Sequence, residues 1–108
     1  MSDVPLTARE ALERAALGDD FDQAVVALVE LAGLHEAEGR LAQAEDAYRE
    51  VVASGHAGQA PRAAFELARI FEARGDTTEA QAAYRYLLSG GMSEYAGPAV
   101  CGLRRLGR

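Results

Sequence analysis

The chain has 108 residues, enough for one compact domain that buries roughly 65% of its unfolded surface. Its 11 basic and 17 acidic residues give a net charge of −6, which disfavours binding to the phosphates of a nucleic acid. A single cysteine excludes an internal disulfide. Residues 1–9 lack a basic region followed by an apolar run, and no stretch of 18 apolar residues occurs, so we expect a cytoplasmic protein without membrane contact.

Alanine and arginine dominate the composition. The 23 alanines predict a thin core in which helices approach each other closely. All 11 basic residues are arginines, which together with the alanines is typical of a GC-rich coding sequence and favours a bacterial source.

Helical spacing of apolar residues, interrupted by glycines and prolines, predicts six helices. Thr7 and Glu10 have the spacing of a capping box, which places a first helix at about 8–17. Pro61 and Pro98 are expected in the first turns of later helices. These later helices are expected at about 23–38, 41–54, 60–74, 77–89 and 96–106.

Further start and stop signals support these limits. Asp22 or a neighbour is expected to cap the helix at 23–38, and Gly39 is expected to end it in a left-handed conformation. Gly75 is expected to end the helix at 60–74 in the same way. Asp76 and Glu79 then have the spacing of a second capping pair.

The chain repeats itself with a period of 36 residues. Residues 30–52 align with 66–88, so that Ala44 matches Ala80 and Tyr48 matches Tyr84. The helix at 8–17 follows the same register. The sequence therefore predicts a single all-α domain, an antiparallel helix-pair solenoid made of a half repeat (7–18), two full repeats (22–54 and 59–89) and another half repeat (94–108).

One helix pair carries a recognisable spacing, Leu67-Ala68, Phe71, Gly75, Ala80, Tyr84 and Leu87, which resembles the tetratricopeptide repeat. The preceding copy departs from it by a histidine, His35, at a position that is usually aromatic. The 36-residue period is also similar to that of the related Sel1-like repeats, and we leave the choice between the two open. The resemblance implies a right-handed superhelix whose concave side, lined by the first helix of each pair, holds a peptide or a partner protein.

Helix positions that pairing does not use are expected to face this groove. An apolar or acidic peptide would suit such a surface. Alternatively, Phe65 and the valines pack neighbouring helices together, and the arginines are solvated or pair with Glu66 and Glu72. The candidate partner-binding residues are Val26, Val29, Glu36, Arg62, Phe65, Arg69, Glu72 and Arg105.

Some tetratricopeptide proteins hold the C-terminal carboxylate of chaperones with lysine and asparagine side chains. The matching positions here carry neither residue type, so this activity is not carried over. They are Val29, Gly33, Glu66, Pro98 and Gly102.

No residues are assigned to catalysis, a cofactor or a metal. His35 is expected to fill a gap between helices, and Cys101 is expected to be a buried or half-buried apolar residue. The aspartates at 19, 20 and 22 are better explained by helix capping than by a cation site. The arginines at 104, 105 and 108 either complement a helix dipole or meet an anionic partner.

The function that these features predict is a non-enzymatic adaptor that binds a protein or peptide. The last helix offers Val100, Leu103 and Leu106 without a following helix to cover them, which predicts docking on another protein or self-association as a two-fold dimer. An alternative is a regulatory module that senses a small ligand or signalling peptide for a separate effector. An enzyme that uses Cys101 or the histidines is a third possibility.

Overall fold

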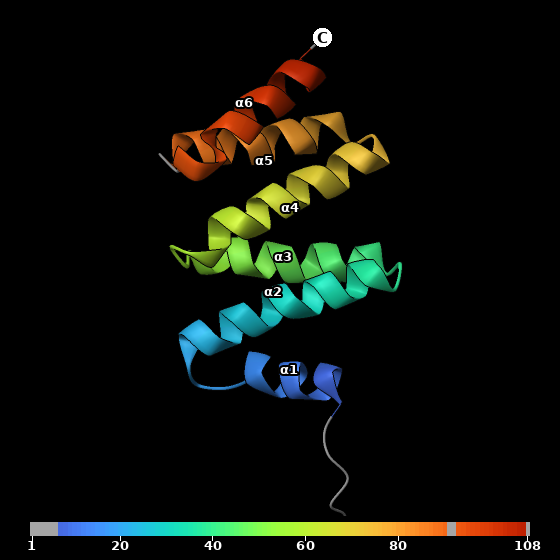
Figure 1. Cartoon of the computed structure of the whole chain (residues 1–108), viewed down its shortest axis with the longest axis vertical. Coiled ribbons are helices and arrows are strands. Elements are labelled where there is room, and N and C mark those ends of the chain that lie inside the picture. Colours follow the sequence, from blue (N-terminus) through green and yellow to red (C-terminus); the bar gives the residue numbers. More distant parts are fainter. Residues whose placement is uncertain (1–6, 91–92, 108) are drawn as a thin grey trace, which may run out of the picture.

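The computed structural model describes residues 7–90 and 93–107, and this part of the chain forms six α-helices and no strand (Figure 1). The all-α prediction is thus confirmed for these ranges. The helices are α1 (Ala8–Ala16), α2 (Phe21–Ala37), α3 (Leu41–Ser54), α4 (Gln59–Arg74), α5 (Thr77–Ser89) and α6 (Ser93–Leu106).

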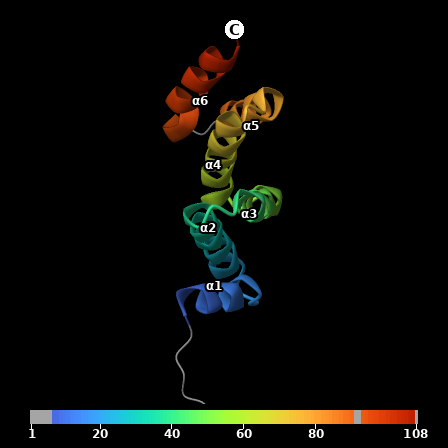
Figure 2. The same ribbon diagram turned by 90° about the vertical axis from the view of Figure 1, so that its right-hand side faces the viewer.

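The helices follow one another along the long axis of the molecule, and each contacts the next in sequence (Figure 1). The described structure measures 60 × 27 × 18 Å. In addition, α2 contacts α4, and α4 contacts α6. Figure 2 shows α3 and α5 on one side and α2, α4 and α6 towards the other. We call the exposed surface of α2, α4 and α6 the first-helix face.

Most of the predicted helix limits hold, with one correction at the caps. The Thr7 hydroxyl accepts a hydrogen bond from the Glu10 N–H at 3.1 Å, and the Glu10 carboxylate accepts one from the Thr7 N–H at 2.9 Å. At the start of α2 the capping residue is Asp20, one of the aspartates expected to cap this helix, since its carboxylate accepts from the N–H of Gln23 at 3.0 Å. The predicted capping pair at Asp76 is wrong, because its side chain makes no capping hydrogen bond.

The start of α6 also differs from the prediction. The helix begins at Ser93, earlier than expected, so Pro98 lies inside the helix and not in its first turn. The missing N–H of Pro98 leaves the carbonyl of Glu94 without its helical partner. Gly39 and Gly75 do end α2 and α4 with left-handed φ angles of 78° and 84°, as expected.

Small residues in the core allow the two helices of each pair to lie close together. Ala32 and Ala44 on the pair α2 and α3, and Ala68 and Ala80 on the pair α4 and α5, are all 0% exposed. At the next position of this series, 36 residues after Ala68, α6 carries an exposed arginine, Arg104. The repeat therefore changes character at its C-terminal end.

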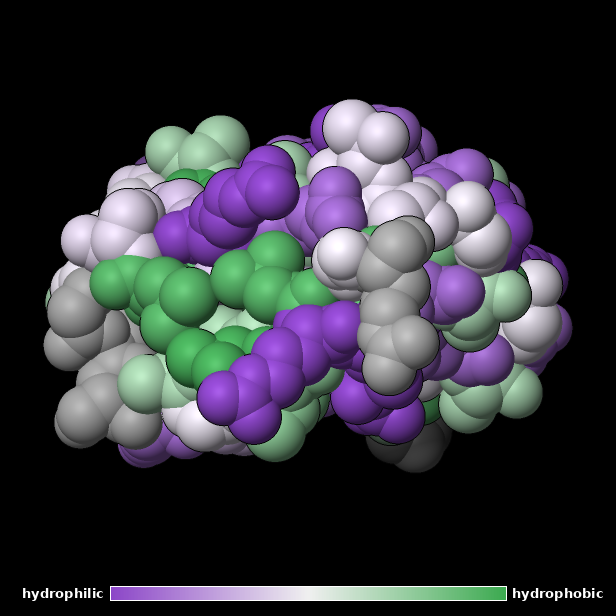
Figure 3. All heavy atoms as spheres, turned by 90° about the horizontal axis from the view of Figure 1, so that it is seen from above, coloured by the Kyte–Doolittle hydropathy of each residue, from purple (hydrophilic) through white to green (hydrophobic). Residues whose placement is uncertain are grey.

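The C-terminal end of the molecule carries an apolar surface. Figure 3 looks onto this end and shows hydrophobic side chains gathered between hydrophilic ones. Leu88 at the end of α5 is 36% exposed and Val100 of α6 is 38% exposed, while Leu103 and Leu106 are half-buried.

Candidate functional site

The first-helix face is hollowed between α4 and α6. The hollow has a volume of about 460 Å³, opens to solvent, and has Tyr84 of α5 among its lining residues. Half of the predicted partner-binding residues meet in it, namely Phe65, Arg69, Glu72 and Arg105. We call this the C-terminal subsite, lined by Phe65, Arg69, Glu72, Ala73, Tyr84, Pro98, Cys101 and Arg105.

A three-residue hydrogen-bond network holds the centre of the C-terminal subsite. Arg105 of α6 donates to the Glu72 carboxylate twice, from Nε to Oε2 at 2.6 Å and from Nη2 to Oε1 at 2.9 Å. The hydroxyl of Tyr84 donates to the same carboxylate at 2.7 Å. Both carboxylate oxygens are thus occupied, and a side-on guanidinium fork of this kind gives both strength and a fixed orientation.

This network fixes the protonation state of its members. The hydrogen bonds from Arg105 hold the pKa of the Glu72 carboxyl below its usual value, and Glu72 raises the pKa of Arg105 in return. Burial, together with the bond to Glu72, raises the pKa of the Tyr84 hydroxyl to about 12. At neutral pH the carboxylate is therefore charged and the hydroxyl keeps the proton that it donates.

An equivalent set of residues lies one repeat earlier, between α2 and α4. The hydroxyl of Tyr48 donates to the Glu36 carboxylate at 2.7 Å, as Tyr84 does to Glu72. We call this set the N-terminal subsite; shifted by 36 positions from the first, it consists of Val29, Gly33, Glu36, Ala37, Tyr48, Arg62, Phe65 and Arg69.

The two subsites differ in the hydrogen-bond partner of their equivalent arginines. Arg69 stands 36 positions before Arg105, yet it donates to Glu66 on its own helix at 3.1 Å and not to Glu36. The Arg69 side chain is 62% exposed. Exposed ion pairs of this kind contribute little to stability, so Arg69 is held only loosely.

The other four predicted partner-binding residues do not lie together in one hollow. Val29 is only 3% exposed and belongs to the core, so its assignment to the open groove is wrong and the packing alternative holds for it. Val26 is 37% exposed but lies in a separate hollow of about 340 Å³ between α1 and α2. Arg62 is exposed on α4, and Glu36 is half-buried.

Sequence reasoning missed the two tyrosines as members of the subsites. Tyr48 and Tyr84 are 3% and 1% exposed, yet their hydroxyls reach the glutamates of the preceding helix. A signal was present, because each tyrosine follows a glutamate by 12 positions in both repeats. It missed Tyr95 of α6 as well, whose ring packs against Phe65 with centroids 5.6 Å apart.

Cys101 was also misplaced, since it is exposed and lines the C-terminal subsite. His35 is half-buried, and its Nδ1 atom is buried without a hydrogen-bond partner in the described structure.

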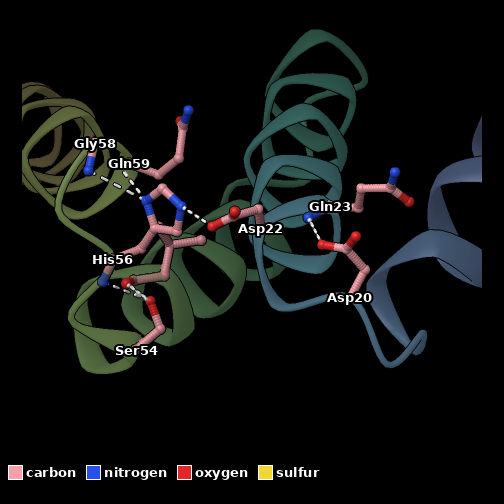
Figure 4. A network of polar contacts seen from close by, with 8 residues as sticks. Asp20, Asp22, Gln23, Ser54, His56, Gly58 and Gln59 are labelled. Carbon is pink, nitrogen blue, oxygen red and sulfur yellow. Dashed lines mark hydrogen bonds and ion pairs between the residues drawn. The ribbon is translucent and has the colours of Figure 1, made fainter.

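A second polar network joins the starts of α2 and α4 at His56 (Figure 4). The His56 Nδ1 atom accepts hydrogen bonds from the N–H groups of Gly58 and Gln59, at 3.2 and 3.1 Å. The ring proton therefore sits on Nε2, which donates to Asp22 at 2.9 Å. The imidazole also packs against the Phe21 ring, with centroids 5.5 Å apart. His56 thus caps α4 and ties it to α2.

The far side of the molecule carries a smaller hollow of about 310 Å³ between α3, α4 and α5. Its wall includes Phe71, over which the guanidinium groups of Arg49 and Arg74 lie at 5.4 and 5.8 Å. Internal packing between helix pairs accounts for these residues.

No family model, curated protein or solved structure matches this chain. None of the helices in the described ranges combines the length and apolar character that crossing a membrane requires. The same residues contain no cluster of three histidine, cysteine, aspartate or glutamate side chains placed to hold a metal ion.

Proposed function

We propose that the protein is a cytoplasmic, non-enzymatic interaction module of the tetratricopeptide or Sel1-like kind. Its first-helix face would be the concave side of a right-handed superhelix and would bind a peptide or protein. The observation that carries this proposal is the recurrence of the same glutamate and tyrosine pair in both subsites, Glu36 with Tyr48 and Glu72 with Tyr84.

The geometry favours an extended ligand. Two equivalent subsites lie side by side on contacting helices, and Phe65 and Arg69 belong to both. A segment laid across α2, α4 and α6 would meet the same kinds of side chain twice, so several weak contacts add to one binding surface. The open hollow supplies room for a side chain of the ligand between Phe65 and Cys101.

The test is affinity capture from the source cell with the native protein and with a Phe65→Ala, Arg69→Glu double variant. Arg85→Glu, an equal charge change at an exposed site of α5, is the matched control. We expect the native protein and the control to recover the same partners and the double variant to lose them. If the double variant, shown to be folded by circular dichroism, still recovers them, the face is wrongly assigned.

A regulatory module that senses a small ligand is the second candidate. It is supported by the volume of the C-terminal subsite alone, about 460 Å³, because the hollow opens to solvent and does not enclose a ligand. A compound that raises the melting temperature of the native protein, but not that of the Arg69→Glu variant, would favour this function over the first.

We also propose that the protein self-associates through its C-terminal end, as a two-fold dimer. The exposed Leu88 and Val100 on that end support this proposal, because apolar patches at the end of a helical stack need cover. Sedimentation should show a mass that rises with concentration, and Val100→Glu should abolish the rise. A native protein that stays monomeric at all concentrations would disprove it.

A further inference from the structure

The two subsites differ in the number of side-chain hydrogen bonds that their glutamate carboxylates accept. Glu72 accepts hydrogen bonds from Tyr84 and, twice, from Arg105. In the described structure, Glu36 accepts one side-chain hydrogen bond, from Tyr48, and has no ion pair. One repeat therefore contains its guanidinium and the other lacks it.

The surroundings of Glu36 leave room for a guanidinium. Gly33 stands where the C-terminal subsite has Arg69, and a Cβ atom built at Gly33 would meet nothing within 4 Å. Arg69, the residue equivalent to Arg105, is turned away towards Glu66. The side chain that the repeat pattern would supply to Glu36 is engaged elsewhere, and the space beside Gly33 is open.

We propose that Glu36 and Tyr48 form a binding site for the guanidinium group of an arginine in a partner peptide. The proposal rests on the proposed function, since it names the chemistry of the ligand that the first-helix face would take. Arg105 provides a template for this site in the same molecule, because its guanidinium contacts the equivalent carboxylate of Glu72 at 2.6 and 2.9 Å.

The geometry of that template selects arginine over lysine. Two N–H groups of Arg105 meet the two oxygens of Glu72 side by side, while Tyr84 approaches the carboxylate separately. A planar guanidinium fork matches two carboxylate oxygens, whereas an ammonium group makes a single-point contact. The burial of Tyr48 further helps, because its hydroxyl fixes the orientation of the Glu36 carboxylate before the ligand arrives.

The electrostatic setting is consistent with a cationic group. The chain as a whole carries a net charge of −6, which attracts basic segments. Next to the site, Arg69 is paired with Glu66, so its charge is already offset, and Arg62 is the remaining positive charge that acts on Tyr48. A ligand arginine at Glu36 would thus complete a row of guanidinium and carboxylate groups across α2, α4 and α6.

The experiment uses three short blocked peptides, each with one central arginine, lysine or citrulline between glycines. Citrulline keeps the shape of arginine without its charge. They are titrated into the native protein while the side-chain carboxyl ¹³C resonances of Glu36 and Glu72 are followed. We expect the arginine peptide to shift the Glu36 resonance and to bind about tenfold or more tightly than the citrulline peptide, the change that losing one charged hydrogen-bonded pair produces.

Two variants localise the effect. Glu36→Gln should reduce the binding of the arginine peptide to the level of citrulline. Glu50→Gln, the same change at an exposed glutamate of α3 outside both subsites, is the matched control and should leave binding within about twofold of native. The comparison of peptides on the native protein needs no variant, so the result does not depend on either variant folding.

Equal binding of the arginine and citrulline peptides would overturn the inference. So would arginine binding that survives Glu36→Gln, or a shift at Glu72 instead of Glu36. A Glu36 carboxylate that is unresponsive because Arg69 already occupies it would refute the open site as well. In each of these cases the proposed function could still pass its own capture test with the Phe65→Ala, Arg69→Glu variant, so the two failures are distinguishable.

Discussion

Replacing Gly102 by alanine tests how closely α6 packs on Tyr84. A Cβ atom at Gly102 would lie 2.4 Å from the Cε2 and Cζ atoms of the Tyr84 ring, far below a van der Waals contact. The ring has no room to withdraw, because Tyr84 is 1% exposed and its hydroxyl is bound to Glu72 at 2.7 Å. The whole of α6 must therefore shift by about 1 Å to accept the methyl group.

Two opposing effects determine how much Gly102→Ala changes the free energy of unfolding. Replacing glycine by alanine inside a helix contributes about 1 kcal/mol of stability. Overpacking against a buried ring costs about 1–3 kcal/mol. The control is Gly33→Ala in the middle of α2, where the new methyl group meets nothing within 4 Å and only the helix effect applies. The two alanine variants should thus differ in stability by about 1–3 kcal/mol, with Gly102→Ala the less stable.

The difference can be measured by urea unfolding followed by far-ultraviolet circular dichroism, and in thermal scans it corresponds to roughly 4 °C per kcal/mol for a domain of this size. Removing the ring with Tyr84→Leu should relieve the clash, so that Gly102→Ala becomes stabilising in that background. If Gly102→Ala and Gly33→Ala are equally stable in the native background, α6 does not pack on Tyr84 as described.

Three further predictions concern the polar groups. His35→Phe should raise the free energy of unfolding by about 1 kcal/mol, because it removes a buried unpaired nitrogen and copies Phe71 of the next repeat; a loss of stability in urea would contradict this. His56→Ala should lower it by about 1–2 kcal/mol and His56→Asn by less, since asparagine keeps an acceptor for the cap of α4; equal losses would contradict the cap. Because the pKa of Glu72 is depressed in the folded state, its contribution is present above its ordinary value of 4.5 and is lost as the pH falls below it. Arg105→Gln should therefore flatten the fall in melting temperature below that pH.

The helices and their pairing could be predicted from sequence because their signals are local. Apolar spacing and the glycines that follow α2 and α4 set the helix limits, and α3 has the limits that were expected for it. Ala44 and Ala80 match in the repeat, and both are 0% exposed in the core. The cap of α2 could not be assigned to one residue from sequence, because Asp20 and Asp22 are close enough in sequence to compete for the same turn.

Burial on the first-helix face could not be predicted, because it depends on the next helix along the stack. Val29, Phe65 and Cys101 hold the same position in successive repeats. Val29 is buried with residues of α4, Phe65 is half-buried beside Tyr95 of α6, and Cys101 on the last described helix is exposed. The same position thus passes from core to surface as its neighbours change.

Sequence reasoning could likewise not predict which glutamate pairs with Arg69 and which with Arg105. Arg69 and Arg105 are equivalent, but only Arg69 has a glutamate three residues earlier on its own helix. Residues at this spacing are neighbours on a helix surface, so Glu66 competes with Glu36 for Arg69. Gly102 stands at the place of Glu66 in α6, so Arg105 has no such competitor there and reaches Glu72.

Arg104 has a consequence for how copies of this protein can meet. It stands where α2 and α4 carry alanines that allow α3 and α5 to lie close. A helix of another copy, laid on α6 in that register, would have to bury or displace a charged side chain at the point of closest approach. Head-to-tail stacking of copies on α6 in that register is therefore expected to be disfavoured. The arginine would thus act as a terminator of polymerisation, and light scattering of Arg104→Ala against the native protein would show whether it does.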